Sequence, residues 1–164
     1  MQLNKKELKP ITDILWYAVL DSQRLEYSIA FMMLLVNQEW DLKDPKQNEA
    51  IDKYMEEITS VSLGSLILKL RKMISLDNNF EEKLKEALLA RNYLIHKFFA
   101  EQGKNLLTIN GRADAINIIK EKRKILYNCY FFLDPFIRNL MELRWIDPNI
   151  GLDEIAAKYE KSDK

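Results

Sequence analysis

Cysteine, histidine, glycine and proline are all scarce in this sequence of 164 residues. It has one cysteine, Cys129, one histidine, His96, four glycines and four prolines. A lone cysteine excludes an intramolecular disulfide and a cysteine-based zinc site, and we expect Cys129 to be a small buried residue. One histidine excludes the usual zinc, haem and Cys–His nucleophilic sites, and no glycine-rich phosphate loop is present. We therefore expect neither a metal nor an organic cofactor.

An excess of charge and a long apolar run are also missing. Twenty-five basic residues balance twenty-five acidic ones, which argues against bulk nucleic-acid binding but leaves room for a small basic cleft. The most hydrophobic run, Ile29 to Val36, is far too short to span a bilayer. The segment from Met1 to Pro10 is polar, unlike a signal peptide. These features predict a cytoplasmic protein with no membrane association.

Leu, Ile, Lys, Glu and Ala dominate what remains, and this mixture favours helices. No segment alternates with the period of a β-strand, and the few glycines and prolines do not suit a β-sandwich or barrel. Pro45 suits a helix start, Gly103 a helix end, Gly111 the residue just before a helix, and Pro135 a kink or break. The sequence predicts an all-α, up-and-down bundle of about five helices in one domain over residues 1–164, with helices near 11–38, 46–58, 66–74, 80–102 and 112–143 and a weak terminal helix near 151–161.

The helix expected over residues 80–102 has two apolar faces. At 100° per residue, one face holds Phe80, Leu84, Ala87, Leu88, Ile95 and Phe98. Arg91 falls in the middle of that face, where an unpaired guanidinium is costly to bury. A second stripe lies roughly opposite and holds Leu89, Tyr93, His96 and Ala100, with Asn92 and His96 as i, i+4 neighbours. Two apolar faces predict that one side packs on the core and the other on a second subunit.

Ordinary structural explanations exist for each of these polar residues. A histidine on an apolar stripe is usually a satisfied structural residue, and a lone arginine can extend to solvent along its alkyl stem. Carboxylate pairs such as Glu56–Glu57, Glu81–Glu82 and Asp153–Glu154 fit helix ends and surfaces. The combination of Arg91, Asn92 and His96 on one doubly apolar helix is what favours a functional site.

The stretch Arg91-Asn92-Tyr93-Leu94-Ile95-His96 resembles the R-x4–6-H signature of HEPN domains, in the form with a polar residue directly after the arginine. The turn Ser62 to Leu66, followed by Arg-Asn-x-Leu-x-His-x-Phe-Phe, is similar to a group of uncharacterised bacterial HEPN-like proteins. The resemblance covers about residues 60–99 and the helix order. It implies a bundle of four or five helices and a homodimer in which the motif helices of two protomers face each other.

Many HEPN proteins are metal-independent endoribonucleases, so the resemblance implies that chemistry here. His96 would move protons at the 2′-OH or the 5′-oxygen, and Arg91 would hold the scissile phosphate. Asn92 would orient His96 or bind the phosphate. The implied function is a bacterial toxin–antitoxin or phage-defence ribonuclease with RNA as substrate and a cognate antitoxin or neighbouring defence protein as partner. In one toxin group a modified tyrosine follows the histidine by two residues; Phe98 stands there, which argues against neutralisation by that route.

Basic residues that could line such a cleft are Lys97, Lys104, Arg112, Lys120, Lys122, Arg123 and Lys124, although a run of this kind is commonly a solvated helix face. Aromatic residues expected in the core and an interface are Tyr127, Tyr130, Phe131, Phe132 and Phe136. Two other functions stay open. One is a catalytically inactive, dimeric HEPN-like adaptor, which the neutral charge favours. The other is a helical module that binds a nucleotide or small ligand in the same cleft.

Overall fold

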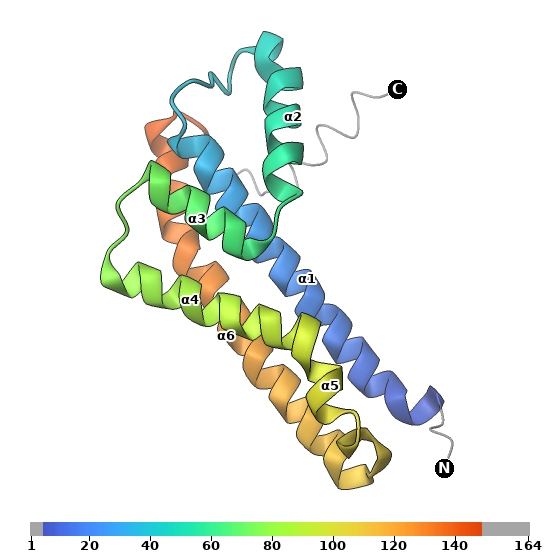
Figure 1. The fold of residues 1–164 in the computed structure, drawn as a ribbon. Coiled ribbons are helices and arrows are strands. Elements are labelled where there is room, and N and C mark those ends of the chain that lie inside the picture. Colours follow the sequence, from blue (N-terminus) through green and yellow to red (C-terminus); the bar gives the residue numbers. More distant parts are fainter. Residues whose placement is uncertain (1–4, 149–164) are drawn as a thin grey trace.

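The computed structural model describes residues 5–148, and its secondary structure within that range is entirely helical (Figure 1). The α-helices are α1 (Lys5–Val36), α2 (Asn48–Thr59), α3 (Leu63–Met73), α4 (Asn78–Asn92), α5 (Phe98–Gln102) and α6 (Ile109–Leu143). A π turn, η2 (Tyr93–Lys97), joins α4 to α5 without a break, and η1 (Pro45–Gln47) and η3 (Asn105–Leu107) are short 3₁₀ turns. The prediction of an all-α bundle of about five helices is confirmed. The helix expected near 151–161 lies outside the described residues.

Side-chain caps set where several helices begin. Asp77 Oδ1 accepts a hydrogen bond from the backbone N–H of Phe80 at 2.8 Å, which starts α4 at Asn78. Ser62 and Thr108 cap α3 and α6 in the same way. Both helices therefore begin about one turn earlier than the apolar spacing alone predicts. The first helix also begins earlier, at Lys5, and includes Pro10.

Gly111 lies inside the first turn of α6, and the prediction that it precedes the helix is wrong. A Cβ atom built on Gly111 would lie 2.1 Å from the backbone oxygen of Asn105 and 2.8 Å from Thr108 Oγ1. This contact places the turn η3 directly against the start of α6. The close approach of two backbone segments is what requires glycine here.

We predict that Gly111→Ala destabilises the protein by about 2–3 kcal/mol, because the added methyl group forces apart a backbone contact and the Thr108 cap. In a chain of this size, that loss corresponds to a fall in Tm of roughly 5–10 °C. Thermal denaturation followed by circular dichroism measures it. The control is Ala113→Gly, at an exposed position one turn along α6, which should cost only about 1 kcal/mol of helix propensity. An unchanged Tm in Gly111→Ala would contradict the close approach.

The sequence predicts a kink or a break at Pro135, and the break does not occur, because α6 continues through the proline to Leu143. Proline removes one backbone N–H, and the carbonyl that loses this donor belongs to exposed Phe131, where water can replace it. Buried Leu133 and Ile137 hold the helix against the bundle on both sides of the proline. Tertiary packing therefore outweighs the local cost.

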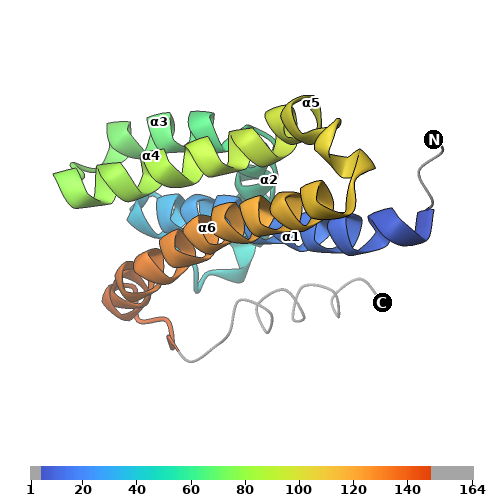
Figure 2. The ribbon, with the colours of Figure 1, turned by 90° about the horizontal axis from the view of Figure 1, so that it is seen from below.

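The bundle has two layers. Figure 2 shows α1 and α6 side by side in one layer, with α3, α4 and α5 in the other. The two long helices run parallel, as two contacts show. Arg123 on α6 pairs with Asp21 on α1, and beyond the C-terminal ends of both helices Arg144, just after α6, donates to the backbone oxygen of Trp40. The rod formed by α4, η2 and α5 runs antiparallel to α6. Its Phe80 end packs on Phe132 and Phe136.

The core lies between these layers, and the second half of α1 is its centre. Every residue from 28 to 35 is buried, because α2, α3 and α6 surround that part of the helix. The rod that carries the motif buries Phe80, Leu84, Ala87 and Phe98, as the apolar spacing predicts. Ile95 is the exception: it is 41% exposed, and Leu94 is buried in its place. None of the described helices is long and apolar enough to cross a membrane.

Candidate functional site

The motif residues lie at a π turn. The backbone N–H of Phe98 donates to the carbonyl of Tyr93, five residues earlier, in place of the usual four. On a regular α-helix, residues five apart point roughly 140° away from each other. A wider turn advances less per residue, so it brings His96 round toward Arg91. The prediction that Arg91 and His96 lie on opposite faces of one regular helix is therefore wrong.

Arg91 and His96 are in direct contact. Arg91 Nη1 lies 3.2 Å from His96 Nε2, and it also donates to Asn92 Oδ1 at 3.3 Å. All three residues predicted for the site are thus brought together by one guanidinium. The i, i+4 approach expected between Asn92 and His96 is replaced by this arrangement, in which Arg91 is the hub.

Glu26 on α1 is the fourth member of the site, and the sequence reading missed it. Its Oε1 lies 3.3 Å from Arg91 Nε, and both side chains are about one-fifth exposed. The two atoms form an ion pair, but they are not aligned for a hydrogen bond, and neither atom has another hydrogen-bond partner in the described chain. Glu26 explains how an arginine is accommodated on a core-facing position: its charge is offset across the α1–α4 contact.

A signal for Glu26 does exist in the sequence. It lies between Leu25 and Ile29, in a stretch of α1 that is apolar on most sides and fully buried at those two positions. A carboxylate and a guanidinium that each interrupt an apolar stripe are natural partners. Sequence alone does not pair them, because that pairing depends on how α1 and α4 are aligned along their length.

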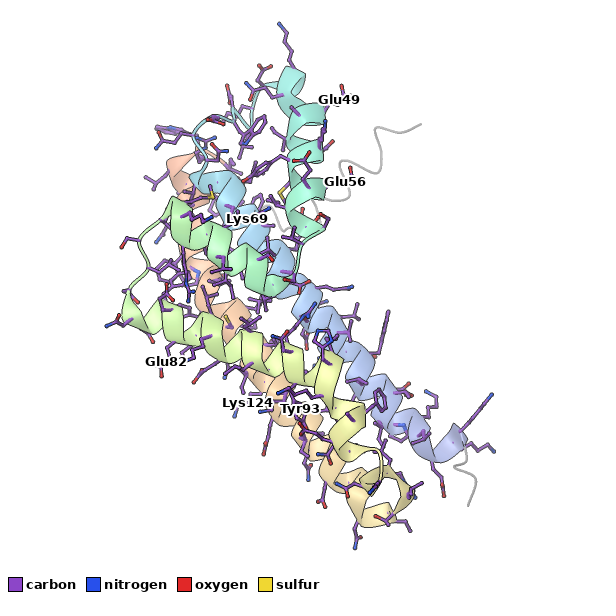
Figure 3. The ribbon with its side chains drawn as sticks, viewed as in Figure 1. Glu49, Glu56, Lys69, Glu82, Tyr93 and Lys124 are labelled. Atoms are coloured by element: carbon purple, nitrogen blue, oxygen red, sulfur yellow. The ribbon has the colours of Figure 1, made fainter. Side chains whose placement is uncertain are left out.

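The second apolar stripe is open in this chain. Leu89 is 61% exposed, His96 and Ala100 are exposed, and Tyr93 is half-buried. Figure 3 shows Tyr93 where the motif rod passes over α6, with Lys124 on the neighbouring stretch of α6. The Nζ atom of Lys122 lies 5.4 Å from the Tyr93 ring centroid, a cation–π contact that ties the rod to α6.

The basic residues divide into two groups. Arg123 pairs with the buried carboxylate of Asp21 and lies over the Tyr17 ring, and Arg112 donates to the backbone oxygen of Leu106 and lies near Glu7, so these arginines hold the bundle together. The members that are exposed are Lys97, Lys104, Lys120 and Lys124. With Lys122, which lies over the Tyr93 ring, these four lysines are the members of the predicted basic set that could attract an anionic ligand.

The carboxylate pairs are surface features where the structure describes them. Arg71 on α3 forms a two-pronged ion pair with Glu81 on α4. Figure 3 shows Glu49 and Glu56 on the outer side of α2, and Glu82 is exposed on α4. Within residues 5–148, no three histidine, cysteine or acidic side chains are grouped closely enough to hold a metal ion.

Cys129 is buried on α6, as predicted, and burial raises the pKa of its thiol to about 12. Only the thiolate is nucleophilic, so we predict that native protein resists alkylation by iodoacetamide at neutral pH. Unfolding in guanidinium chloride exposes the thiol and should restore labelling. Mass spectrometry of both samples measures this, and rapid labelling of the native chain would contradict it. Because the folded thiol holds its proton more tightly than the ordinary value of 9.0, its contribution to stability is lost as pH rises above 9.

Comparisons of this chain with protein-family models, curated proteins and solved structures found no match. The site is therefore defined by its own geometry, with Glu26, Arg91, Asn92 and His96 gathered at a π turn.

Proposed function

We propose that this protein is a metal-independent endoribonuclease of the HEPN type, acting in a bacterial toxin–antitoxin or phage-defence system. The observation that carries the proposal is the contact between Arg91 Nη1 and His96 Nε2 at the π turn. Irregular π turns are often found at functional sites. Here the irregularity joins the two side-chain types that phosphodiester cleavage without a metal requires.

The chemistry follows from the substrate. RNA carries its own nucleophile, so cleavage needs a base for the 2′-OH, an acid for the 5′-oxygen and positive charge at phosphorus. His96 Nε2 takes the 2′ proton, the 2′-oxygen attacks phosphorus, and the 5′-oxygen leaves with a proton. Arg91 neutralises the charge that develops on the phosphate. The products are a 2′,3′-cyclic phosphate and a 5′-hydroxyl end.

This scheme requires a second copy of the chain. The attacking and leaving oxygens lie on opposite sides of phosphorus, so one imidazole cannot serve both at once, and each chain has only one histidine. A homodimer through the motif rod supplies two. The open stripe on that rod, together with the exposed rings of Phe99, Tyr127 and Phe131, gives apolar surface for such an interface.

The test is to incubate the purified protein with end-labelled RNA in EDTA and to identify the product ends. Cleavage to 2′,3′-cyclic phosphates by wild type, with loss in Arg91→Ala and His96→Ala, is the expected result. Equal inertness of all three proteins across varied RNAs would rule the proposal out. Sedimentation velocity tests the dimer separately: a monomer at micromolar concentration would contradict the shared site.

A catalytically inactive dimeric adaptor is the second candidate. Four large apolar side chains exposed near the motif rod and along α6, namely Leu89, Phe99, Tyr127 and Phe131, suit a protein-binding surface as well as a dimer. Net charge of zero also gives no general attraction to RNA. An adaptor would bind an antitoxin or neighbouring defence protein with unchanged affinity in His96→Ala, whereas the ribonuclease needs that imidazole.

A further inference from the structure

The contact between Arg91 and His96 indicates which imidazole nitrogen carries the proton. A guanidinium has five N–H donors and no acceptor, so in the 3.2 Å contact Nε2 of His96 must accept. His96 is then neutral, with its proton on Nδ1. Free neutral histidine in water prefers the proton on Nε2, so Arg91 holds the less common tautomer. The lone pair needed for catalysis is the one that Arg91 occupies.

Arg91 holds this position through weak contacts. Its Nη1 is shared between two neutral acceptors, Asn92 Oδ1 at 3.3 Å and His96 Nε2 at 3.2 Å, at or beyond the long end of the usual range for hydrogen bonds. Its Nε is held by charge to Glu26 without an aligned hydrogen bond. A phosphate oxygen is a charged acceptor and forms shorter, stronger hydrogen bonds with arginine than either neutral group does.

We propose that Arg91 blocks the general base, His96, until a phosphate draws the guanidinium away. We call this block the cap. Without substrate, Nη1 of Arg91 occupies Nε2 of His96. When a phosphodiester enters the site, Nη1 turns to the phosphate, while the charge on Glu26 keeps the guanidinium in place. Nε2 is then free to take the 2′ proton, breaking the O–H bond and forming N–H. The cap rests on the proposed ribonuclease function, and it restricts base catalysis to a site that already holds its phosphate.

Nuclear magnetic resonance tests the cap directly, because His96 is the sole histidine. A tag-free chain labelled with ¹⁵N-histidine gives one imidazole, and long-range ¹H–¹⁵N correlation shows which nitrogen bears the proton. The spectra are recorded at about pH 8.5, where a free imidazole in water is neutral. We expect an unprotonated Nε2 in wild type without phosphate. Added inorganic phosphate should leave the proton on Nδ1 and move the Nε2 resonance, because the Nε2 lone pair loses its Arg91 donor and becomes free.

Three controls make the result specific. Sodium chloride at equal ionic strength should leave the Nε2 resonance unchanged, which separates binding from screening. Arg91→Ala should show the Nε2–H tautomer without phosphate and should not respond to it. Arg71→Ala removes another arginine that pairs with a glutamate across two helices, and it should behave as wild type.

Two results would overturn the cap: a wild-type Nε2 that is protonated without phosphate, or one whose resonance does not move throughout the phosphate titration. Both are read from wild type alone, so they stand even if a variant folds poorly. Parallel RNA assays separate the cap from the proposed function. A phosphate-driven change at the Nε2 resonance without cleavage supports the cap while the ribonuclease proposal fails, and cleavage without that change overturns the cap alone.

Discussion

RNA cleavage by His96→Ala is expected to be about 1,000-fold slower than by wild type. Removing a general acid–base group commonly costs 100- to 10,000-fold, and a dimer with one histidine per chain would lose its base and its acid together. His96 is exposed, so its truncation opens no cavity in the core. Single-turnover cleavage of a labelled RNA measures the rate, and a thermal melt should show an unchanged Tm.

The matched control for this experiment is Glu101→Ala, which truncates another exposed side chain on the same rod, one turn beyond the π turn. Its cleavage rate should stay close to that of wild type. A contaminating ribonuclease would cut RNA equally in all three preparations. A wild-type rate in His96→Ala would therefore show that the activity does not belong to this site.

Much of the fold could be predicted because it depends on local chemistry. The caps at Ser62, Asp77 and Thr108 act within three residues of sequence, and the apolar spacing of each helix reports the face that it buries. The effect of Pro135 could not be predicted, since it depends on whether packing on both sides outweighs one lost hydrogen bond.

The site was predictable in its members but not in its geometry. The helical spacing of 100° per residue indicated that Arg91 needs a partner, because it places this charged side chain on a core-facing position. It could not supply Glu26, which reaches Arg91 only through the alignment of α1 with α4. The same spacing could not predict the π turn, because a constant 100° per residue places Ile95 on the core-facing side and His96 opposite Arg91. Burial of Leu94 in place of Ile95 marks the same local change.

Arg91→Lys provides the sharpest test of that geometry, because it keeps the positive charge and removes the planar fork. A lysine ends in a single nitrogen, so it cannot contact Glu26 through one nitrogen and Asn92 and His96 through another, as Nε and Nη1 of the guanidinium do. We expect cleavage to fall about 100-fold, equivalent to roughly 2.7 kcal/mol of transition-state stabilisation. Rates in 50 and 200 mM salt, compared at saturating RNA, separate this loss from weakened electrostatic attraction.

The double variant Arg91→Lys/His96→Ala then shows whether the two side chains act as one unit. If Arg91 works by positioning the phosphate for His96 and by releasing Nε2, its replacement has little left to impair once the imidazole is gone. The double variant should therefore cleave RNA about as slowly as His96→Ala alone, because residues that act together lose their effects non-additively. Full additivity of the two losses would mean that Arg91 stabilises charge independently of His96. In that case their contact at the π turn would be structural, and the planar fork of Arg91 would act on the phosphate without His96.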